Sequence, residues 1–228
     1  MKSRMIVVAG GLSFIVGALA FVLVFSYLAA NFNYPSVLDG SAAEVLPRLR
    51  AGGPNMRAIW AIHAFLPLLL VPGAVGAYFA CPSSSGRMSL AVVAASIGAL
   101  AMCLGLMRWP SIHWILAEAY AESGAEAKAS LSAVFTGLNQ YLGNYIGEFF
   151  GEACLAVFFL LAGLAMLDEA RFPAWSGWCG VAFGALFIVG AWRNVTPTVQ
   201  AMADINNYLL PLWMIVLGAC LVWYSRRA

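Results

Sequence analysis

Residues 5–30 read MIVVAGGLSFIVGALAFVLVFSYLAA, a run of 26 amino acids without a charged side chain. A helix that crosses a bilayer needs about 20 mostly apolar residues, because it rises only about 1.5 Å per residue. The run is also longer than the roughly 7–15 apolar residues at the centre of a cleavable signal peptide. It therefore predicts an uncleaved first membrane helix, and with it the class of fold.

Five further stretches of the chain have the same apolar character. They are residues 57–80, 88–109, 130–167, 174–193 and 204–225. Together with the first run they take up most of the chain, so residues 1–228 are predicted to form a single integral membrane domain. We expect an all-α fold, a polytopic transmembrane bundle of six helices surrounded by the lipid bilayer.

The overall composition supports this class. Hydrophobic residues make up 63% of the chain and charged residues only 10%, whereas soluble domains carry about 25% charged residues. So few charges could not cover a surface in water, which excludes soluble enzymes and disordered scaffolds. The 12 basic and 10 acidic residues nearly balance, so the charge indicates no nucleic-acid partner.

The connections between the helices bear on orientation. Basic residues are equally numerous on the two sides, but three on one side, Arg57, Arg108 and Arg193, stand at predicted helix ends and can belong to the bundle. Setting those three aside favours the other side as cytoplasmic under the positive-inside rule. Its basic residues are Lys2, Arg4, Arg87, Arg171, Arg226 and Arg227. Both chain termini are then predicted to face the cytoplasm of a bacterium, with the protein in its inner membrane.

The first outer connection, residues 31–56, contains a helix-start signal. Ser41 precedes Glu44 by three residues, the spacing of a capping box. The apolar residues that follow are Val45, Leu46 and Leu49. We expect a short interfacial helix that presents these side chains to the membrane.

Polar groups enter the membrane mainly within residues 138–152, which read LNQYLGNYIGEFFGE. Polar side chains recur there every fourth residue and so share one slowly drifting face of the helix. They are Gln140, Asn144, Glu148 and Glu152. Glycines form a second stripe beside them, at Gly143, Gly147 and Gly151. Small residues at this spacing allow close approach of another helix, within the chain or from a membrane-protein partner or a second copy.

Glu148 and Glu152 are the principal candidates for chemistry. A carboxylate at this depth costs at least a few kcal/mol unless it is protonated, paired or hydrated. Intramembrane ionisable groups are functional by default, and two carboxylates four residues apart favour one of them holding a proton. The alternative is that both only tie helices together through arginine or backbone partners.

Possible partners gather in the same outer half of the membrane. Pro110 disfavours helical geometry at Trp109, so the chain should bend there and turn Arg108 inward. His63 lies about two turns from the outer end of the second helix. The ligand-binding candidates are Arg108, Trp109, His63, Gln140, Asn144 and Arg193. They predict a polar pocket open to the outside.

Three functions remain open at this stage. In the first, the pocket binds or acts on a small lipophilic ligand, with Glu148 or Glu152 as acid or base and Arg108 steadying negative charge. In the second, His63, His113 and the two glutamates hold haem or a metal ion for redox chemistry. In the third, the chain is a non-catalytic subunit of a membrane complex. The sequence itself identifies no cofactor and does not decide whether the protein is an enzyme.

Three short motifs carry a resemblance to a known family. They are Gly105-Leu106-Met107-Arg108-Trp109, Asn139-Gln140-Tyr141-Leu142-Gly143 and Gly147-Glu148-Phe149-Phe150-Gly151. With the length and the proline-containing first outer connection, the chain resembles a family of small six-helix bacterial membrane proteins classified only as a domain of unknown function. The resemblance implies the fold and topology and implies no activity.

Overall fold

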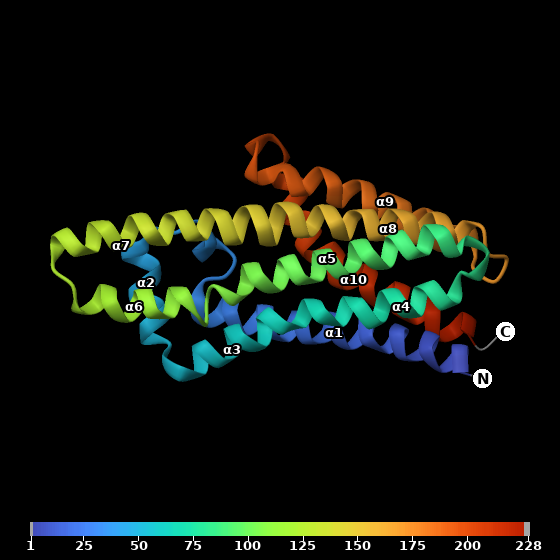
Figure 1. Ribbon diagram of the computed structural model, residues 1–228, viewed down its shortest axis with the longest axis horizontal. Coiled ribbons are helices and arrows are strands. Elements are labelled where there is room, and N and C mark those ends of the chain that lie inside the picture. Colours follow the sequence, from blue (N-terminus) through green and yellow to red (C-terminus); the bar gives the residue numbers. More distant parts are fainter. Residues whose placement is uncertain (1, 226–228) are drawn as a thin grey trace.

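The computed structural model describes residues 2–225, and within them every regular element is helical (Figure 1). The α-helices are α1 (Lys2–Phe32), α2 (Ala42–Ala51), α3 (Gly53–Phe65), α4 (Leu70–Ala80), α5 (Ser85–Met107), α6 (Ile112–Glu122), α7 (Ala125–Leu138), α8 (Gly151–Leu167), α9 (Ala174–Ala191) and α10 (Gln200–Tyr224). Short 3₁₀ turns are η1 (Ser36–Asp39), η2 (Leu66–Leu69), η3 (Pro82–Ser84), η5 (Trp192–Asn194) and η6 (Pro197–Val199), and η4 (Asn139–Phe150) is a π-helix.

Six continuous helical stretches in the described part are long and apolar enough to cross a membrane. They are Ser3–Phe32, Gly53–Ala80, Pro82–Glu122, Ala125–Leu167, Ala174–Asn194 and Pro197–Trp223. The predicted all-α bundle of six membrane helices is therefore confirmed, and the chain is a multi-pass membrane protein.

Two of these stretches are interrupted at prolines. The second changes from α3 to α4 through the turn η2, where Pro67 has no backbone N–H to donate to the preceding helix. The third breaks at residues 108–111, next to Pro110, before α6 resumes. Residues from both interruptions line the candidate site described below.

Pairs of glycines bring the membrane helices into backbone contact. Gly10 of α1 faces Gly76 of α4, and Gly105 of α5 faces Gly147 of η4. A β-carbon added at Gly105 would lie 2.6 Å from the Cα atom of Gly147. The same arrangement joins α1 to α10 at Gly11 and Gly218, and α8 to α9 at Gly163 and Gly180. Because lipid tails are as apolar as the side chains, such close van der Waals contact is a main source of helix association in a bilayer.

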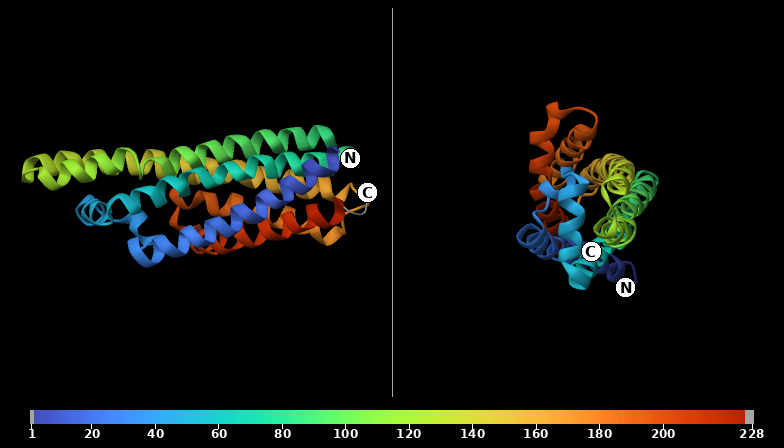
Figure 2. Two further views of the ribbon diagram at one scale, coloured as in Figure 1. Left: turned by 90° about the horizontal axis from the view of Figure 1, so that it is seen from below. Right: turned by 90° about the vertical axis from the view of Figure 1, so that its left-hand side faces the viewer.

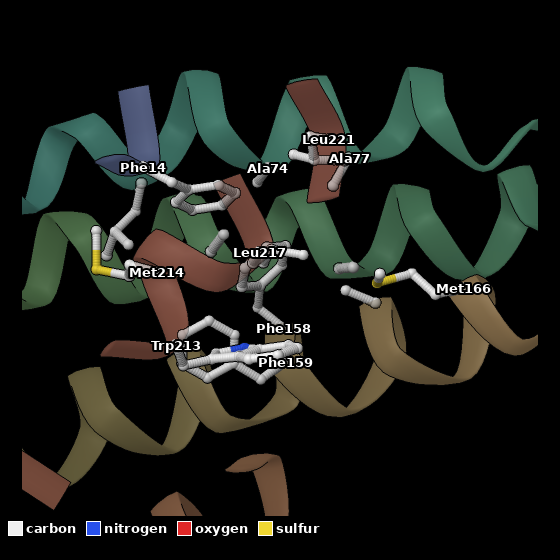
Figure 3. Packing of buried hydrophobic residues seen from close by; sticks show 14 of the residues in the cluster. Phe14, Ala74, Ala77, Phe158, Phe159, Met166, Trp213, Met214, Leu217 and Leu221 are labelled. Carbon is white, nitrogen blue, oxygen red and sulfur yellow. The ribbon is translucent and has the colours of Figure 1, made fainter. Parts of the chain in front are cut away.

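The part of the bundle away from the cap end is an apolar core (Figure 3). Phe14 of α1, Phe158 and Phe159 of α8, and Trp213 of α10 meet there, with small residues of α4 and α5 filling the space between them. The rings of Phe14 and Phe158 lie 5.9 Å apart between centroids. This packed region forms the inner boundary of the polar groups discussed below.

Helices α6 and α7 form a hairpin that extends beyond the other helices, and α2 packs across it (Figures 1 and 2). We call these three helices the cap. The stretch Ala125–Leu167 has 43 residues, which is roughly 64 Å of helix against about 30 Å of bilayer hydrocarbon. The cap therefore projects from the membrane surface.

The expectation that Val45, Leu46 and Leu49 face the membrane was wrong. All three are buried in a second apolar cluster, between α2 and the hairpin, together with Trp114 and Phe135. The capping box at the start of α2 is present, because the Ser41 N–H and hydroxyl both donate to Glu44. The pattern identified an apolar helix face correctly, but an apolar face does not reveal whether lipid or protein covers it.

The opposite end of the bundle holds the start of α1 and the end of α10 (Figure 1). Two connections are tied together there by polar contacts. Arg87 forms an ion pair of 2.6 Å with Asp168, and the backbone N–H of Ser83 donates to Glu169 at 2.7 Å. Two of the basic residues that the sequence places on this side, Arg226 and Arg227, lie outside the described residues.

We predict that Gly105→Ala destabilises the protein by about 1–3 kcal/mol, the usual cost of overpacking a tight contact. The added methyl group would separate α5 from η4. The measurement is thermal unfolding in detergent, followed by intrinsic tryptophan fluorescence.

The matched control for that substitution is Gly137→Ala. Nothing lies within 4 Å of a β-carbon at Gly137, so the higher helix propensity of alanine should stabilise this variant by up to about 1 kcal/mol. Equal unfolding midpoints for the two variants would show that the Gly105–Gly147 contact does not limit the packing.

Candidate functional site

A cavity of about 300 Å³ lies in the bundle, on the side toward the cap. Its wall is built from the loop after α1, from α3 and the turn η2, and from α5, η4 and α10. The two proline interruptions contribute directly, because Leu66 and Pro67 come from one and Arg108 from the other. The volume is at the lower limit of small-molecule sites, which is about 300 Å³.

An ion-pair triad occupies one wall. Arg193 donates to both carboxylate oxygens of Glu152, at 2.6 and 2.8 Å, and its second terminal nitrogen lies 3.0 Å from Glu148. Such a two-pronged contact is the strongest geometry available to arginine. The i, i+4 spacing of the two glutamates along the helix puts both within reach of this one guanidinium.

Asn194 completes this wall. Its amide donates to the side chain of Glu148 at 3.0 Å and to the backbone carbonyl of Asn144 at 2.8 Å. Within residues 2–225, the Glu148 carboxylate contacts Asn194 and Arg193 through the same oxygen, Oε2. Glu148 therefore keeps its other oxygen for a further partner, whereas both oxygens of Glu152 are engaged.

Arg108 lies on a different part of the wall and has a different environment. Its residue is only 3% exposed. The guanidinium donates to Asn139 at 3.1 Å and to the Gly105 carbonyl at 2.6 Å, and it lies 5.1 Å from the ring centre of Trp109. No carboxylate of the described residues lies within 4.0 Å of it. The sequence placed Arg108 beside the glutamates, but Arg193 is the residue that pairs with them.

Gly143 makes room for Arg108. A β-carbon added at Gly143 would overlap the guanidinium. Gly147 and Gly151, the other members of that stripe, pack on Gly105 and Met102 of α5. The stripe is therefore used within the chain, which is one of the alternatives that its spacing left open. The spacing indicated a close helix neighbour and did not show which helix it would be.

An aromatic corner closes the cavity beside Arg108. The ring of Tyr34 lies 6.0 Å from His63 and 5.7 Å from Trp60, and Trp60 stacks on Trp109 at 4.7 Å. Nδ1 of His63 is buried without a hydrogen-bond partner in the described part of the chain. Burial raises the pKa of the Tyr34 phenol well above its usual range, so the phenol is protonated at neutral pH.

The loop that carries Tyr34 is tied to the arginine through Asn139. The Asn139 amide donates to the Leu38 carbonyl at 2.8 Å, while its oxygen accepts from Arg108. Sequence reasoning missed Tyr34 and Asn139 as site residues. The position of Asn139 at the start of the polar run was a usable signal, but its partner Leu38 lies 101 residues away. Asp39 stands at the cavity rim, and burial, followed by the charge of Glu148, raises the pKa of its carboxyl.

The structure brings together five of the residues selected from the sequence. Those on the cavity wall are Glu148, Glu152, Arg108, His63 and Arg193. Trp109 is buried behind Arg108, while Asn144 and Gln140 bond to each other at 3.0 Å and do not line the cavity. Residues 139–150 are π-helical, which changes the direction in which the polar stripe drifts around the helix axis.

The four residues considered for haem or metal are not assembled as a ligand set. His113 is fully buried between Trp109 and Phe135, away from the cavity. The chain of ring contacts from His63 to His113 passes through Trp60 and Trp109. Among residues 2–225, no three His, Cys, Asp or Glu side chains lie close enough together to hold a metal ion.

Comparison with curated proteins and with solved structures found no match. The sequence does match a protein family over residues 9–222, nearly its whole length, and that family is described as "Domain of unknown function (DUF4386)". The match includes four of the membrane helices in full, most of the first and the last, and every residue of the cavity wall. The chain therefore belongs to the DUF4386 family, whose function has not been assigned.

Proposed function

We propose that this membrane protein binds a small amphipathic ligand in the cavity, with the polar end of the ligand between Arg108 and Glu148. The proposal includes orientation: the cavity opens toward the outside of a bacterial inner membrane, and both termini are cytoplasmic. Three arginines support this orientation, since Arg4, Arg87 and Arg171 belong to segments at the end of the bundle opposite the cap.

The observation that carries the proposal is that two kinds of side chain line the cavity. The charged ones, which we call the polar half, are Arg108, Glu148, Glu152 and Arg193. The apolar ones, which we call the apolar half, include Phe21, Leu66, Leu70, Leu210 and Met214. A ligand with an apolar body and a polar end satisfies both halves, whereas a purely polar or purely apolar molecule leaves one of them uncompensated.

Within this proposal the two glutamates have different roles. Glu152 is held by Arg193 through both oxygens and fixes the wall. The other oxygen of Glu148 makes no hydrogen bond or ion pair within the described part of the chain, so Glu148 is the group available to accept a proton or hydrogen bond from a ligand. If the protein catalyses a reaction, Glu148 is the acid or base we propose.

The first test fills the apolar half. Leu210→Trp should abolish binding of decanol and decanoate, because the larger side chain occupies the ligand volume. Binding is measured as the rise of the thermal unfolding midpoint with ligand concentration, in a detergent with a bulky sterol body that does not compete for the cavity. Native mass spectrometry of the same samples counts bound molecules per chain.

The matched control is Leu212→Trp on the same helix. Leu212 is 54% exposed and does not line the cavity, so this variant should bind like the unmodified protein. The proposal fails if the unmodified protein binds neither compound, or if both tryptophan variants bind equally well.

The second test separates the structural arginine from the one assigned to the ligand. Arg193→Gln should destabilise the protein by about 3–5 kcal/mol, because it leaves two buried carboxylates without their cation. Arg108→Gln loses two hydrogen bonds from a charged group, worth about 1.5–3 kcal/mol each, but removing a buried charge that no carboxylate contacts offsets much of that loss.

The free energy of unfolding should therefore change much less for Arg108→Gln than for Arg193→Gln. Chemical denaturation in mixed micelles, without added ligand, measures both values. Equal losses of stability would indicate that Arg108 is as structural as Arg193.

A further inference from the structure

One wall of the cavity carries more hydrogen-bond donors than the protein uses. A guanidinium has five N–H groups, and Arg108 donates one to Asn139 and one to Gly105. The remaining three have no partner among the described residues, and Arg108 lines the cavity. A buried cation with unused donors needs an acceptor, since an uncompensated charge in a membrane costs several kcal/mol.

Tyr34 adds another donor to the same wall. Its hydroxyl makes no hydrogen bond to any residue in the described range, and its ring lines the cavity beside His63. The phenol is a donor at neutral pH, as its raised pKa requires. Arg108 and Tyr34 thus present a phenol and a cation to the same space, a combination complementary to an oxyanion.

The carboxylates around the cavity contact other groups or solvent rather than Arg108. Arg193 supplies one positive charge to Glu148 and Glu152, and Asn194 donates a hydrogen bond to Glu148. Asp39 and Asp204 stand at the rim with exposed side chains, where water and salt screen their charge. Arg108 is buried, so its charge is screened far less than theirs.

We propose that the ligand is a single-chain amphipath with an oxyanion head, held by Arg108 and Tyr34. This inference rests on the proposed function and specifies its ligand class. A carboxylate and a phosphate monoester share the required chemistry, because both offer acceptor oxygens to a guanidinium and a phenol. The apolar half of the cavity receives the hydrocarbon chain.

The experiment compares four compounds with the same ten-carbon chain: decanoate, decyl phosphate, decanol and decylamine. Affinities come from thermal unfolding midpoints, in the same sterol-type detergent at neutral pH. Decanoate or decyl phosphate should bind at least about tenfold more tightly than decanol, since hydrogen bonds to charged groups contribute about 1.5–3 kcal/mol. Decylamine should bind least. The stronger of the two anions identifies the head group.

Three variants test whether Arg108 and Tyr34 cause the preference for anions. Arg108→Gln should reduce the ratio of anion to alcohol affinity to about one, whereas Arg108→Lys should keep an anion preference because it keeps the charge. Tyr34→Phe removes only the hydroxyl and should lower anion affinity a few-fold, and it serves as the test if Arg108→Gln does not fold. Arg57→Gln is the control, because Arg57 contacts Pro110 and does not line the cavity.

The possible outcomes separate the two proposals. If none of the four compounds binds, the proposed function itself fails. If all four bind with similar affinity, or if decylamine binds most tightly, the cavity binds an amphipath but the oxyanion inference is wrong. Acetate and inorganic phosphate form the last arm. Stabilisation by either of them equal to that of the ten-carbon anions would show a site for free anions and overturn the role of the chain.

Discussion

Backbone contact between glycines is the interaction on which the rest of this structure depends. A membrane bundle gains little from hiding apolar surface, because lipid solvates that surface well. The helices must gain their attraction from contact area, and Gly10–Gly76 and Gly105–Gly147 provide it at two of the crossings. The Gly105–Gly147 contact also brings α5 against η4 and so places Arg108 over Gly143. The position of Arg108 in the cavity wall therefore depends on residues 105, 143 and 147 being glycines.

The two buried arginines show two ways of placing a charge inside a membrane protein. Arg193 is neutralised by Glu148 and Glu152 and joins the end of α9 to η4 and α8. Arg108 is stabilised only by neutral acceptors and by the face of Trp109. A fold selected for stability alone has little use for the second arrangement. The difference between the two arginines therefore separates two walls. The wall with Arg193 holds the bundle together through ion pairs, and the wall with Arg108 remains available to a ligand.

Hydropathy was sufficient to predict the six membrane helices, because each apolar run is long enough to cross a bilayer as a helix. It did not predict the cap, since the apolar faces of α2, α6 and α7 resemble lipid-facing surface when read one at a time. Only pairing between distant segments shows that Leu46 and Phe135 cover each other.

At the site, residue type and depth were enough to select Glu148, Glu152, Arg108, His63 and Arg193. They were not enough to pair them. Arg108 and Arg193 end similar helices at similar depth, and the choice between them as partner for the glutamates depends on helix rotation. The π-helical turns of η4 shift that rotation within the polar run itself. Tyr34 was missed because it lies in a loop, and the conformation of that loop, which no periodic sequence pattern indicates, places its side chain in the cavity wall.

The chain has two apolar cores that lie in different solvents. The cluster around Phe14 and Trp213 is surrounded by lipid-facing helices, whereas the cluster around Leu46 and Trp114 lies in the cap, where the hairpin extends past the bilayer. Exposure of apolar surface to water is what gives unfolding its large positive heat capacity. Most of the heat-capacity change of this protein should therefore arise from the cap, and cooling or urea should weaken the cap well before it loosens the helices in the bilayer. Thermodynamically, the protein is a water-soluble folding unit built onto a lipid-soluble one, with the cavity near their junction.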